Sequence, residues 1–155
     1  MKIYLCGPDV FRHNAKEYLH NLSLLCEKYG FIGLSPFDNE SIISEDIFIN
    51  NIMLMNNADI IIANLQPFRG SNVDDGTAFE IGYCFSKKKL IFGYTEIYNK
   101  ELIDITYEHE MNPGLMEVEN FGHCRNLMIV HSIEQSGGKI LETFEDCLKY
   151  LKNFK

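Results

Sequence analysis

The chain has 155 residues, of which 46% are hydrophobic and 23% are charged, and its formal net charge is −8 at pH 7. This length suffices for a real hydrophobic core, so we expect residues 1–155 to form one domain. The negative charge argues against nucleic acid or an anionic membrane as a partner, because both require clustered Lys and Arg side chains. No apolar run approaches a membrane span, and the run before Gly7 is too short for a signal peptide. We therefore expect a cytoplasmic protein.

The five cysteines are an odd number without a CxxC pair, and neither they nor the five histidines show zinc-site spacing. We expect reduced, mostly buried thiols and no metal. The glycine-rich motif of dinucleotide sites, GxGxxG, does not follow the first predicted strand, and the P-loop motif is absent as well. The sequence therefore predicts a protein that needs no cofactor.

Apolar runs and helical periodicity alternate along the chain. Strands are predicted at 2–6, 31–35, 60–65 and 90–94, and helices at 11–29, 44–57 and from the 66–75 loop to about 86. Residues 96–123 are irregular and polar, which is long for an ordinary loop, so they are predicted to form a lid or a subunit contact. Residues 121–125 read as a polar surface turn. Residues 127–131 fit a strand or a helix, and 140–154 are predicted to form a last amphipathic helix.

This alternation predicts the α/β class: a doubly wound parallel sheet of four to five strands, flavodoxin-like or Rossmann-like, with helices on both faces. If the strand order is 2-1-3-4, the chain reverses direction between the first and third strands. Ligands of such sheets bind beyond the carboxyl ends of the strands at this reversal. The segments 7–11 and 66–75 are expected to meet there.

The helix after the third predicted strand begins with three carboxylates, Asp74, Asp75 and Glu80. In a structural interpretation, Glu80 completes a capping box with Thr77, and Asp74 or Asp75 is an N-cap. In a functional interpretation, two carboxyl groups in different environments cleave a glycosidic bond with retention. Aromatic side chains that suit a flat base are expected near by, at Tyr4, Phe11, Phe68, Phe79 and Tyr83.

Four stretches carry a resemblance to a known family. They are IYLCGPDVF at 3–11, PFDNE at 36–40, the segment from AD at 58–59 to PFRG at 67–70, and DDGTAFEIGY at 74–83. Together they resemble the nucleoside 2-deoxyribosyltransferase family from residue 2 to about 94, and the resemblance resumes at 117–128. The block from 67 to 83 is the most specific part.

The resemblance implies roles for individual residues. Glu80 would be the nucleophile that attacks C1′ of a 2′-deoxynucleoside, Asp74 the acid that protonates the departing base, and Tyr4 the residue that orients Glu80 through its hydroxyl. Because Asp75 stands where the family has a small residue, the choice of acid between Asp74 and Asp75 stays open. Substrate contacts are expected at Gly7, Asp9, Phe11, Glu40, Asn51, Phe68, Gly76 and Asn126. Among these, Glu40 would contact the base, Asn51 the sugar 3′-hydroxyl, and Asn126 the 5′-hydroxyl in a neighbouring subunit's site.

The implied partners are 2′-deoxynucleosides and free nucleobases, with a purine bias, in a homo-oligomer (a dimer or larger) that shares its active sites. Two alternatives remain. The first is an N-glycosidase that hydrolyses 2′-deoxynucleoside 5′-monophosphates, for which Arg69 and Arg125 are the candidate phosphate ligands. The second is a non-catalytic nucleotide-binding module built on the same sheet.

Overall fold

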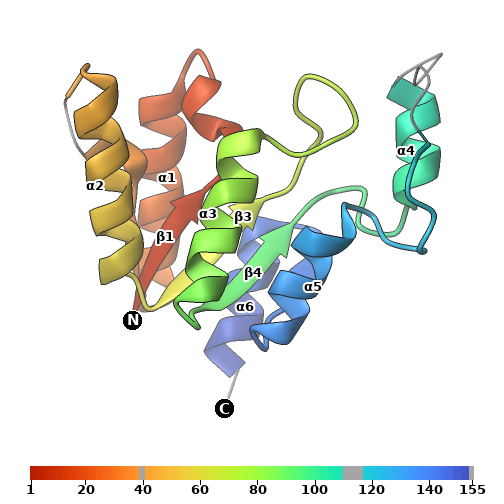
Figure 1. The fold of residues 1–155 in the computed structure, drawn as a ribbon. Helices are drawn as coiled ribbons and strands as arrows, with labels where there is room; N and C mark the ends of the chain where they lie inside the picture. Colours follow the sequence, from red (N-terminus) through yellow and green to blue (C-terminus); the bar gives the residue numbers. More distant parts are fainter. Residues whose placement is uncertain (39–40, 110–116, 154–155) are drawn as a thin grey trace.

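The computed structural model describes residues 1–38, 41–109 and 117–153, and its elements alternate between strand and helix (Figure 1). The strands are β1 (Lys2–Cys6), β2 (Ile32–Leu34), β3 (Ile60–Asn64), β4 (Leu90–Tyr94) and β5 (Ile140–Leu141). The α-helices are α1 (Ala15–Lys28), α2 (Ser44–Asn57), α3 (Asp75–Ser86), α4 (Leu102–His109), α5 (Leu127–Gln135) and α6 (Phe144–Asn153). Two short 3-10 helices, η1 (Pro8–Phe11) and η2 (Pro36–Asp38), follow β1 and β2.

The strands form one parallel sheet in the order β2-β1-β3-β4-β5. The predicted order of the first four strands is therefore confirmed, and β5 adds a short fifth strand beside β4. From β1 the chain crosses to β2 on one side and later returns to β3 on the other. This is the doubly wound, flavodoxin-like architecture, and its reversal point lies between β1 and β3.

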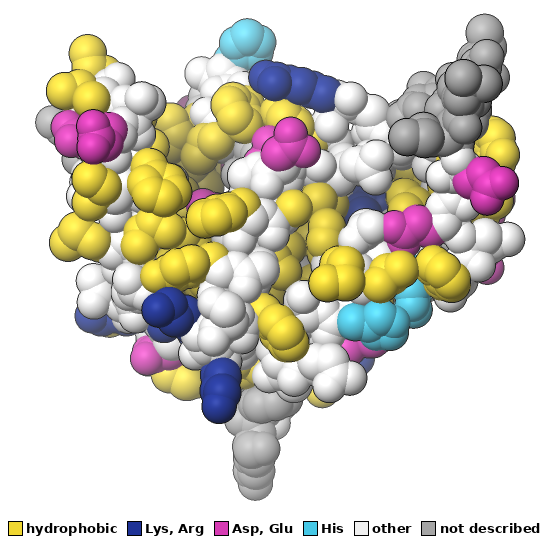
Figure 2. Space-filling view, viewed as in Figure 1, with side chains coloured by type: hydrophobic (Ala, Val, Ile, Leu, Met, Phe, Trp, Pro, Cys, Tyr) yellow, Lys and Arg dark blue, Asp and Glu magenta, His cyan; other side chains and the backbone are white. Residues whose placement is uncertain are grey.

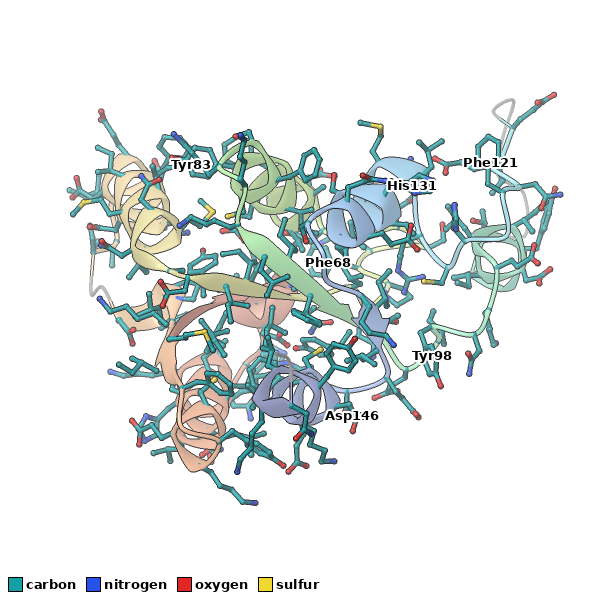
Figure 3. The ribbon with its side chains drawn as sticks, turned by 90° about the horizontal axis from the view of Figure 1, so that it is seen from below. Phe68, Tyr83, Tyr98, Phe121, His131 and Asp146 are labelled. Atoms are coloured by element: carbon teal, nitrogen blue, oxygen red, sulfur yellow. The ribbon has the colours of Figure 1, made fainter. Side chains whose placement is uncertain are left out.

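Alternate residues of each buried strand face opposite layers of helices. In β1, Ile3 and Leu5 pack into a core with α1 and α6, whereas Tyr4 and Cys6 pack into a second core with α2, α3 and α5. Figure 3 shows these two helical layers on either side of the sheet. Because all five residues of β3 are buried, its apolar run has no exposed face, as expected for a central parallel strand.

Three sequence predictions are wrong. Residues 102–109, predicted to be irregular, form α4, which Figure 1 shows to one side of the main body. The predicted first helix begins at Ala15, because residues 8–11 form η1 instead. Residues 140–141, predicted as helix, pair with Gly93 and Tyr94 as β5. The open choice at 127–131 is resolved as helix, within α5.

All five cysteines are buried free thiols, as their number and spacing predict. Within the ranges that the structure describes, no group of three or more His, Cys, Asp or Glu side chains is arranged to hold a metal ion. In the same ranges, no helix is both long enough and apolar enough to cross a membrane.

Candidate active site

Helix α3 begins next to the reversal point, and Asp74 is its N-cap. The Asp74 Oδ2 atom accepts hydrogen bonds from the backbone N–H of Thr77 at 2.9 Å and from its hydroxyl at 3.1 Å. The prediction that Asp74 or Asp75 is the N-cap of this helix is therefore confirmed for Asp74. The predicted capping box between Thr77 and Glu80 is wrong, because the Glu80 carboxylate accepts a hydrogen bond from Tyr4 of β1 instead.

Glu80 lies in the second turn of α3 and reaches down to β1. The hydroxyl of Tyr4, which is fully buried in the middle of β1, donates a 2.6 Å hydrogen bond to Oε1 of Glu80. Glu80 itself is partly exposed. The carboxylate is thus held from the sheet side while its helix lies at the surface.

Burial raises the pKa of Glu80 above its usual value of 4.5, and the negative charge of Asp74 adds to this rise. The hydrogen bond from the Tyr4 hydroxyl lowers the pKa and so opposes it. Burial, followed by the charge of Glu80, raises the pKa of the Tyr4 hydroxyl, so this hydroxyl remains a protonated donor. Asp74 occupies the positive end of α3, where a negative charge is favoured. The two carboxyl groups therefore lie in different environments, one between sheet and helix and one at a helix start.

An aromatic pair links the two loops at the reversal point. The rings of Phe11 and Phe68 stack with their centroids 5.2 Å apart, and the Arg69 guanidinium lies over both rings, at 5.2 Å and 4.7 Å. Phe11 is 57% exposed, so this stack presents aromatic surface to solvent. The structure thus joins η1 to the 66–74 loop, as the sequence predicts. Phe79 and Tyr83 stack on each other along α3 and approach α2 instead.

One glycine among the predicted site residues is required by geometry, and a second is closely packed. Gly7 has φ of 151°, and a Cβ atom on it would lie 2.6 Å from the Cβ of Asn64. A Cβ atom on Gly76 would lie 3.0 Å from Oδ2 of Asp74. Larger residues would therefore displace η1 at the first position and the Asp74 carboxylate at the second.

Asp9, also predicted to contact substrate, is bound inside the fold. Its carboxylate accepts hydrogen bonds from Nε of Arg12 at 2.6 Å, Nδ2 of Asn64 at 2.8 Å and the Tyr94 hydroxyl at 3.3 Å. Asp9 is only 4% exposed. These bonds fix η1 against the ends of β3 and β4, and the substrate contact of Asp9 stays a prediction.

Two of the remaining predicted residues, Asn51 and Asn126, make no hydrogen bond to Glu80 within the described ranges. Asn126 is the N-cap of α5: its Oδ1 accepts from the Met128 N–H at 3.0 Å, and its Nδ2 donates to Glu119. Across the described ranges, no hydrogen bond joins Asn126 to the Tyr4–Glu80 pair. Asn51 is partly exposed in α2, and Glu40 lies outside the described residues.

Arg125 is a buried residue that the sequence analysis placed in a surface turn, and for this residue the prediction is wrong. Its side chain is 1% exposed and donates to the carbonyls of Leu65 and Cys124 at 2.6 and 2.5 Å. A third bond, of 3.1 Å, reaches the hydroxyl of Thr95. Burial lowers the pKa of the guanidinium. The polarity of residues 121–125 gave no sign of this, because a buried arginine and an exposed one have the same local sequence pattern.

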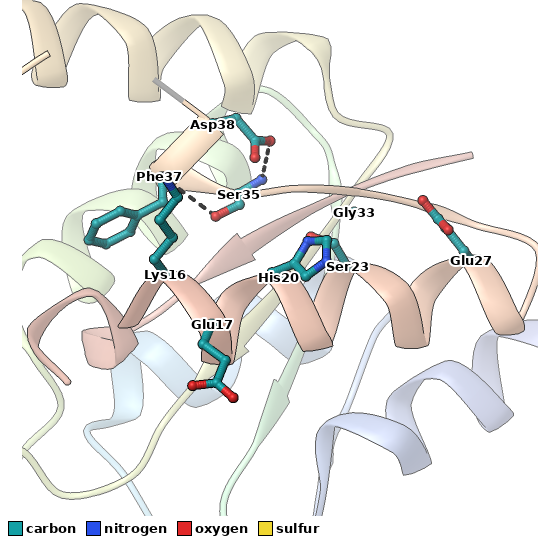
Figure 4. Close-up of a pocket in the computed structure, with 9 residues that line it drawn as sticks. All are labelled: Lys16, Glu17, His20, Ser23, Glu27, Gly33, Ser35, Phe37 and Asp38. Carbon is teal, nitrogen blue, oxygen red and sulfur yellow. Dashed lines mark hydrogen bonds between the residues drawn. The ribbon is translucent and has the colours of Figure 1, made fainter. Parts of the chain in front are cut away.

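A separate cleft of about 720 Å³ lies between α1 and the edge of the sheet at β2 (Figure 4). The residues that line it come from one stripe of α1, from β2 and from η2. At η2 the Asp38 carboxylate accepts a hydrogen bond from the Ser35 N–H at 2.9 Å. Tyr4, Asp74 and Glu80 do not line it. The carboxylate pair therefore belongs to the α3 side of the sheet, away from this cleft.

The fold and the site together define a class of protein: a flavodoxin-like α/β protein with paired carboxyl groups where a strand passes into a helix at the reversal point. The comparisons with known proteins refine this class. The family model described as nucleoside 2-deoxyribosyltransferase matches residues 3–128. The chain belongs to the nucleoside 2-deoxyribosyltransferase family.

The chain is also similar to individual proteins. The solved structure of a 2-desoxiribosyltransferase from Leishmania mexicana is 33% identical, with a TM-score of 0.83 over 99% of this chain and 97% of that one. The chain shares its fold with a CMP N-glycosidase from Clostridium botulinum, with a TM-score of 0.60 and 17% sequence identity. The match covers 99% of this chain and 100% of that one. An uncharacterized Schizosaccharomyces pombe protein is 35% identical over 103 residues, 60% of this chain and 49% of its own length. The chain thus spans about half the length of this curated relative.

Proposed function

We propose that this protein is an N-deoxyribosyltransferase that exchanges the base of 2′-deoxynucleosides through a covalent deoxyribosyl–Glu80 intermediate. The observation that carries the proposal is the 2.6 Å hydrogen bond from the Tyr4 hydroxyl to Glu80, which follows the Asp74 N-cap by six residues in α3. The Leishmania mexicana relative is described as a 2-desoxiribosyltransferase, which supports the same activity. We further propose that residues 1–155 act as one domain in the cytoplasm.

In the proposed first step, the Glu80 carboxylate attacks C1′ as the bond from C1′ to the base nitrogen breaks. The electron pair of that bond leaves with the base, and Asp74 gives the base a proton. In the second step, a new base attacks C1′, the ester bond to Glu80 breaks, and the proton of the incoming base returns to Asp74. Dividing the exchange into two displacements lets a base intercept the sugar before water does. Tyr4 holds Glu80 in position through both steps.

A phosphate-recognising hydrolase is less well supported than a transferase. The hydrolase alternative needs arginines for a 5′-phosphate, and Arg125 is committed to the buried carbonyls of Leu65 and Cys124. Arg69 remains, but it lies over the Phe11–Phe68 stack. The carboxylates at the start of α3 would repel a phosphate. These features favour an uncharged nucleoside, and the intact Tyr4–Glu80 pair disfavours a non-catalytic binding module.

One assay separates the three functions: deoxyinosine and adenine are incubated with the protein, and the products are resolved by chromatography. We expect deoxyadenosine and hypoxanthine. Hypoxanthine with free deoxyribose would show hydrolysis instead, and unchanged substrates would indicate a binding module. Repeating the assay with deoxyinosine 5′-monophosphate tests the preference for uncharged nucleosides.

The purine bias is proposed from Glu40. An ionised carboxylate only accepts hydrogen bonds, so it favours bases that present N–H or NH₂ groups, whereas a Gln both donates and accepts. With thymine and adenine as competing acceptors, Glu40→Gln is expected to raise the share of thymidine formed. An unchanged ratio would remove Glu40 from base selection.

We also propose a homo-oligomer with shared sites, and exposed apolar side chains support it. Phe48 of α2 and Phe79 of α3 are 56% and 53% exposed with ring centroids 6.3 Å apart, and Met128 of α5 is 68% exposed. Figure 2 shows hydrophobic side chains gathered over α2 and α3. Contiguous exposed apolar surface of this kind marks interaction sites. Each site would take Glu80 from one chain and Asn126 from another.

Mixing two inactive variants tests the shared site. Glu80→Ala and Asn126→Ala are unfolded together and refolded, and subunit exchange is confirmed by mass. In a hybrid dimer one site carries both lesions and the other carries neither. Activity should therefore return to about a quarter of wild type under random pairing. Activity no greater than that of the two separate variants would show that Asn126 serves its own chain.

A further inference from the structure

Glu119 is a carboxylate that the proposed mechanism does not use, and it binds the start of α5. Its Oε1 atom accepts a hydrogen bond from the side-chain amide of Asn126, the N-cap of that helix. Its Oε2 atom accepts from the backbone N–H of Leu127 at 2.9 Å. One carboxylate thus occupies two neighbouring donors, one from a side chain and one from the backbone.

The start of a helix is a place where anions bind, because its first N–H groups lack partners within the helix and form the positive end of its dipole. In α5, the second, third and fourth of these N–H groups are bound by the side chain and the carbonyl of Asn126. The first, that of Leu127, is bound by Glu119. The carboxylate therefore stands where an external anion such as a phosphate would otherwise bind.

Within the described ranges, no cationic side chain forms an ion pair with Glu119. Arg125, which precedes Asn126 in the chain, is turned into the fold, where it donates to the carbonyls of Leu65 and Cys124. An anion that approached the Asn126 amide would therefore meet an uncompensated carboxylate rather than a cationic pocket.

We propose that Glu119 makes the site selective for 2′-deoxynucleosides over their 5′-monophosphates. This inference rests on the proposed function, in which Asn126 contacts the sugar 5′-hydroxyl in the neighbouring subunit's site. A 5′-hydroxyl is tolerated beside Glu119, because it has a proton to donate to a carboxylate. A phosphate on the same oxygen would lie about two hydrogen-bond lengths from Glu119 and would be repelled by its charge. The selectivity thus comes from a repulsive group as well as from attractive contacts.

Glu119→Gln tests the selectivity, since the amide keeps the size of the side chain and removes its charge. Exchange with adenine is measured for deoxyinosine and for deoxyinosine 5′-monophosphate, in wild type and in the variant. We expect the preference for the nucleoside, measured as the ratio of the two kcat/KM values, to fall about tenfold in the variant. The change should come from a lower KM for the monophosphate, with kcat for deoxyinosine changed at most a few-fold.

Glu117→Gln is the matched control. Glu117 is exposed and lies two positions before Glu119, and its substitution changes the net charge by the same amount. Its preference for the nucleoside should equal that of wild type. An unchanged preference in Glu119→Gln, or an equal fall in Glu117→Gln, overturns the proposal. A wild type that prefers the monophosphate overturns it as well.

A second measurement needs no activity. Inorganic phosphate is titrated at constant ionic strength while NMR follows the N–H signal of Leu127, and circular dichroism confirms the fold of each protein. Glu119→Ala frees this N–H and the Asn126 amide, so the signal should shift with phosphate in the variant and stay in place in wild type. Equal shifts in both proteins, or a shift in neither, overturn the proposal. If no protein exchanges bases, the proposed function fails, while this titration still decides whether Glu119 closes the start of α5 to phosphate.

Discussion

Asp9 and Glu80 are carboxylates on opposite faces of the sheet, close to the same strand ends. Asp9 accepts from Arg12, Asn64 and Tyr94, the last of which belongs to the core with α1 and α6. Glu80, in contrast, is held by a hydrogen bond from the Tyr4 hydroxyl. A buried carboxylate with many donors stabilises a fold, whereas one with few donors has a raised pKa and remains available for chemistry.

The largest effect in this comparison is expected for Glu80→Gln. The change keeps the size of the side chain but removes the charge of the nucleophile, so base exchange should fall by about a thousandfold or more. Circular dichroism should show an unchanged fold. Mass spectrometry of wild type with a 2-fluoro analogue should place one sugar adduct on the peptide that contains Glu80. Substantial exchange by the folded variant would rule out Glu80 as nucleophile.

The next effect separates Asp74 from Asp75. Asp74→Asn keeps a side chain that caps α3. It loses the acid that protonates the departing base, so kcat should fall by about 10² to 10⁴. Asp75→Asn is the matched control: Asp75 is exposed in the first turn, and its substitution should change kcat only a few-fold. The opposite ranking would assign the acid to Asp75.

Much of the α3 side of the sheet could be predicted from the sequence, because its signals are local. A β-branched run at 60–62 predicts a central strand, and the segment 74–86 carries both an N-cap and a helical repeat. The alternation of strands and helices then brings the first and third strands together. The Tyr4–Glu80 contact was implied by family resemblance, and the structure shows the hydrogen bond itself.

The parts that could not be predicted depend on contacts between distant segments. The two residues of β5 are a strand only because Gly93 and Tyr94 pair with them. The η1 turn is held by Asn64 and Tyr94, both far from Asp9 in the chain. Arg125 is buried because the carbonyl of Leu65 and the hydroxyl of Thr95 accept its protons. No periodicity within these short segments reports such partners.

For the Asp9 carboxylate, we expect that the substitution Asp9→Asn lowers the stability of the fold. The amide cannot accept from Arg12, Asn64 and Tyr94 as the carboxylate does, so the free energy of unfolding should fall by about 1–3 kcal/mol. Urea denaturation measures this, with Asp75→Asn as the exposed control. The KM of the variant tests the substrate contact predicted for Asp9. A fall in stability with a steady KM would make Asp9 structural, whereas a raised KM with wild-type stability would contradict the comparison.

The smallest effect is the pH dependence of stability in Glu80→Gln. Because burial raises the pKa of Glu80 above 4.5, the folded state favours the protonated carboxyl group. This contribution to stability is fully present below the usual pKa and is lost as pH rises through the raised value. The Gln side chain of the variant does not ionise, so the variant does not lose stability in this way. The variant should therefore gain stability relative to wild type as pH rises above 4.5, and the gain should level off once Glu80 is fully ionised in wild type. Urea unfolding at a series of pH values measures the difference. The opposite result would be a free energy of unfolding that rises more for wild type than for the variant as pH increases. In that case ionised Glu80 stabilises the fold, as Asp9 is expected to do, and the two carboxylates do not differ in this respect.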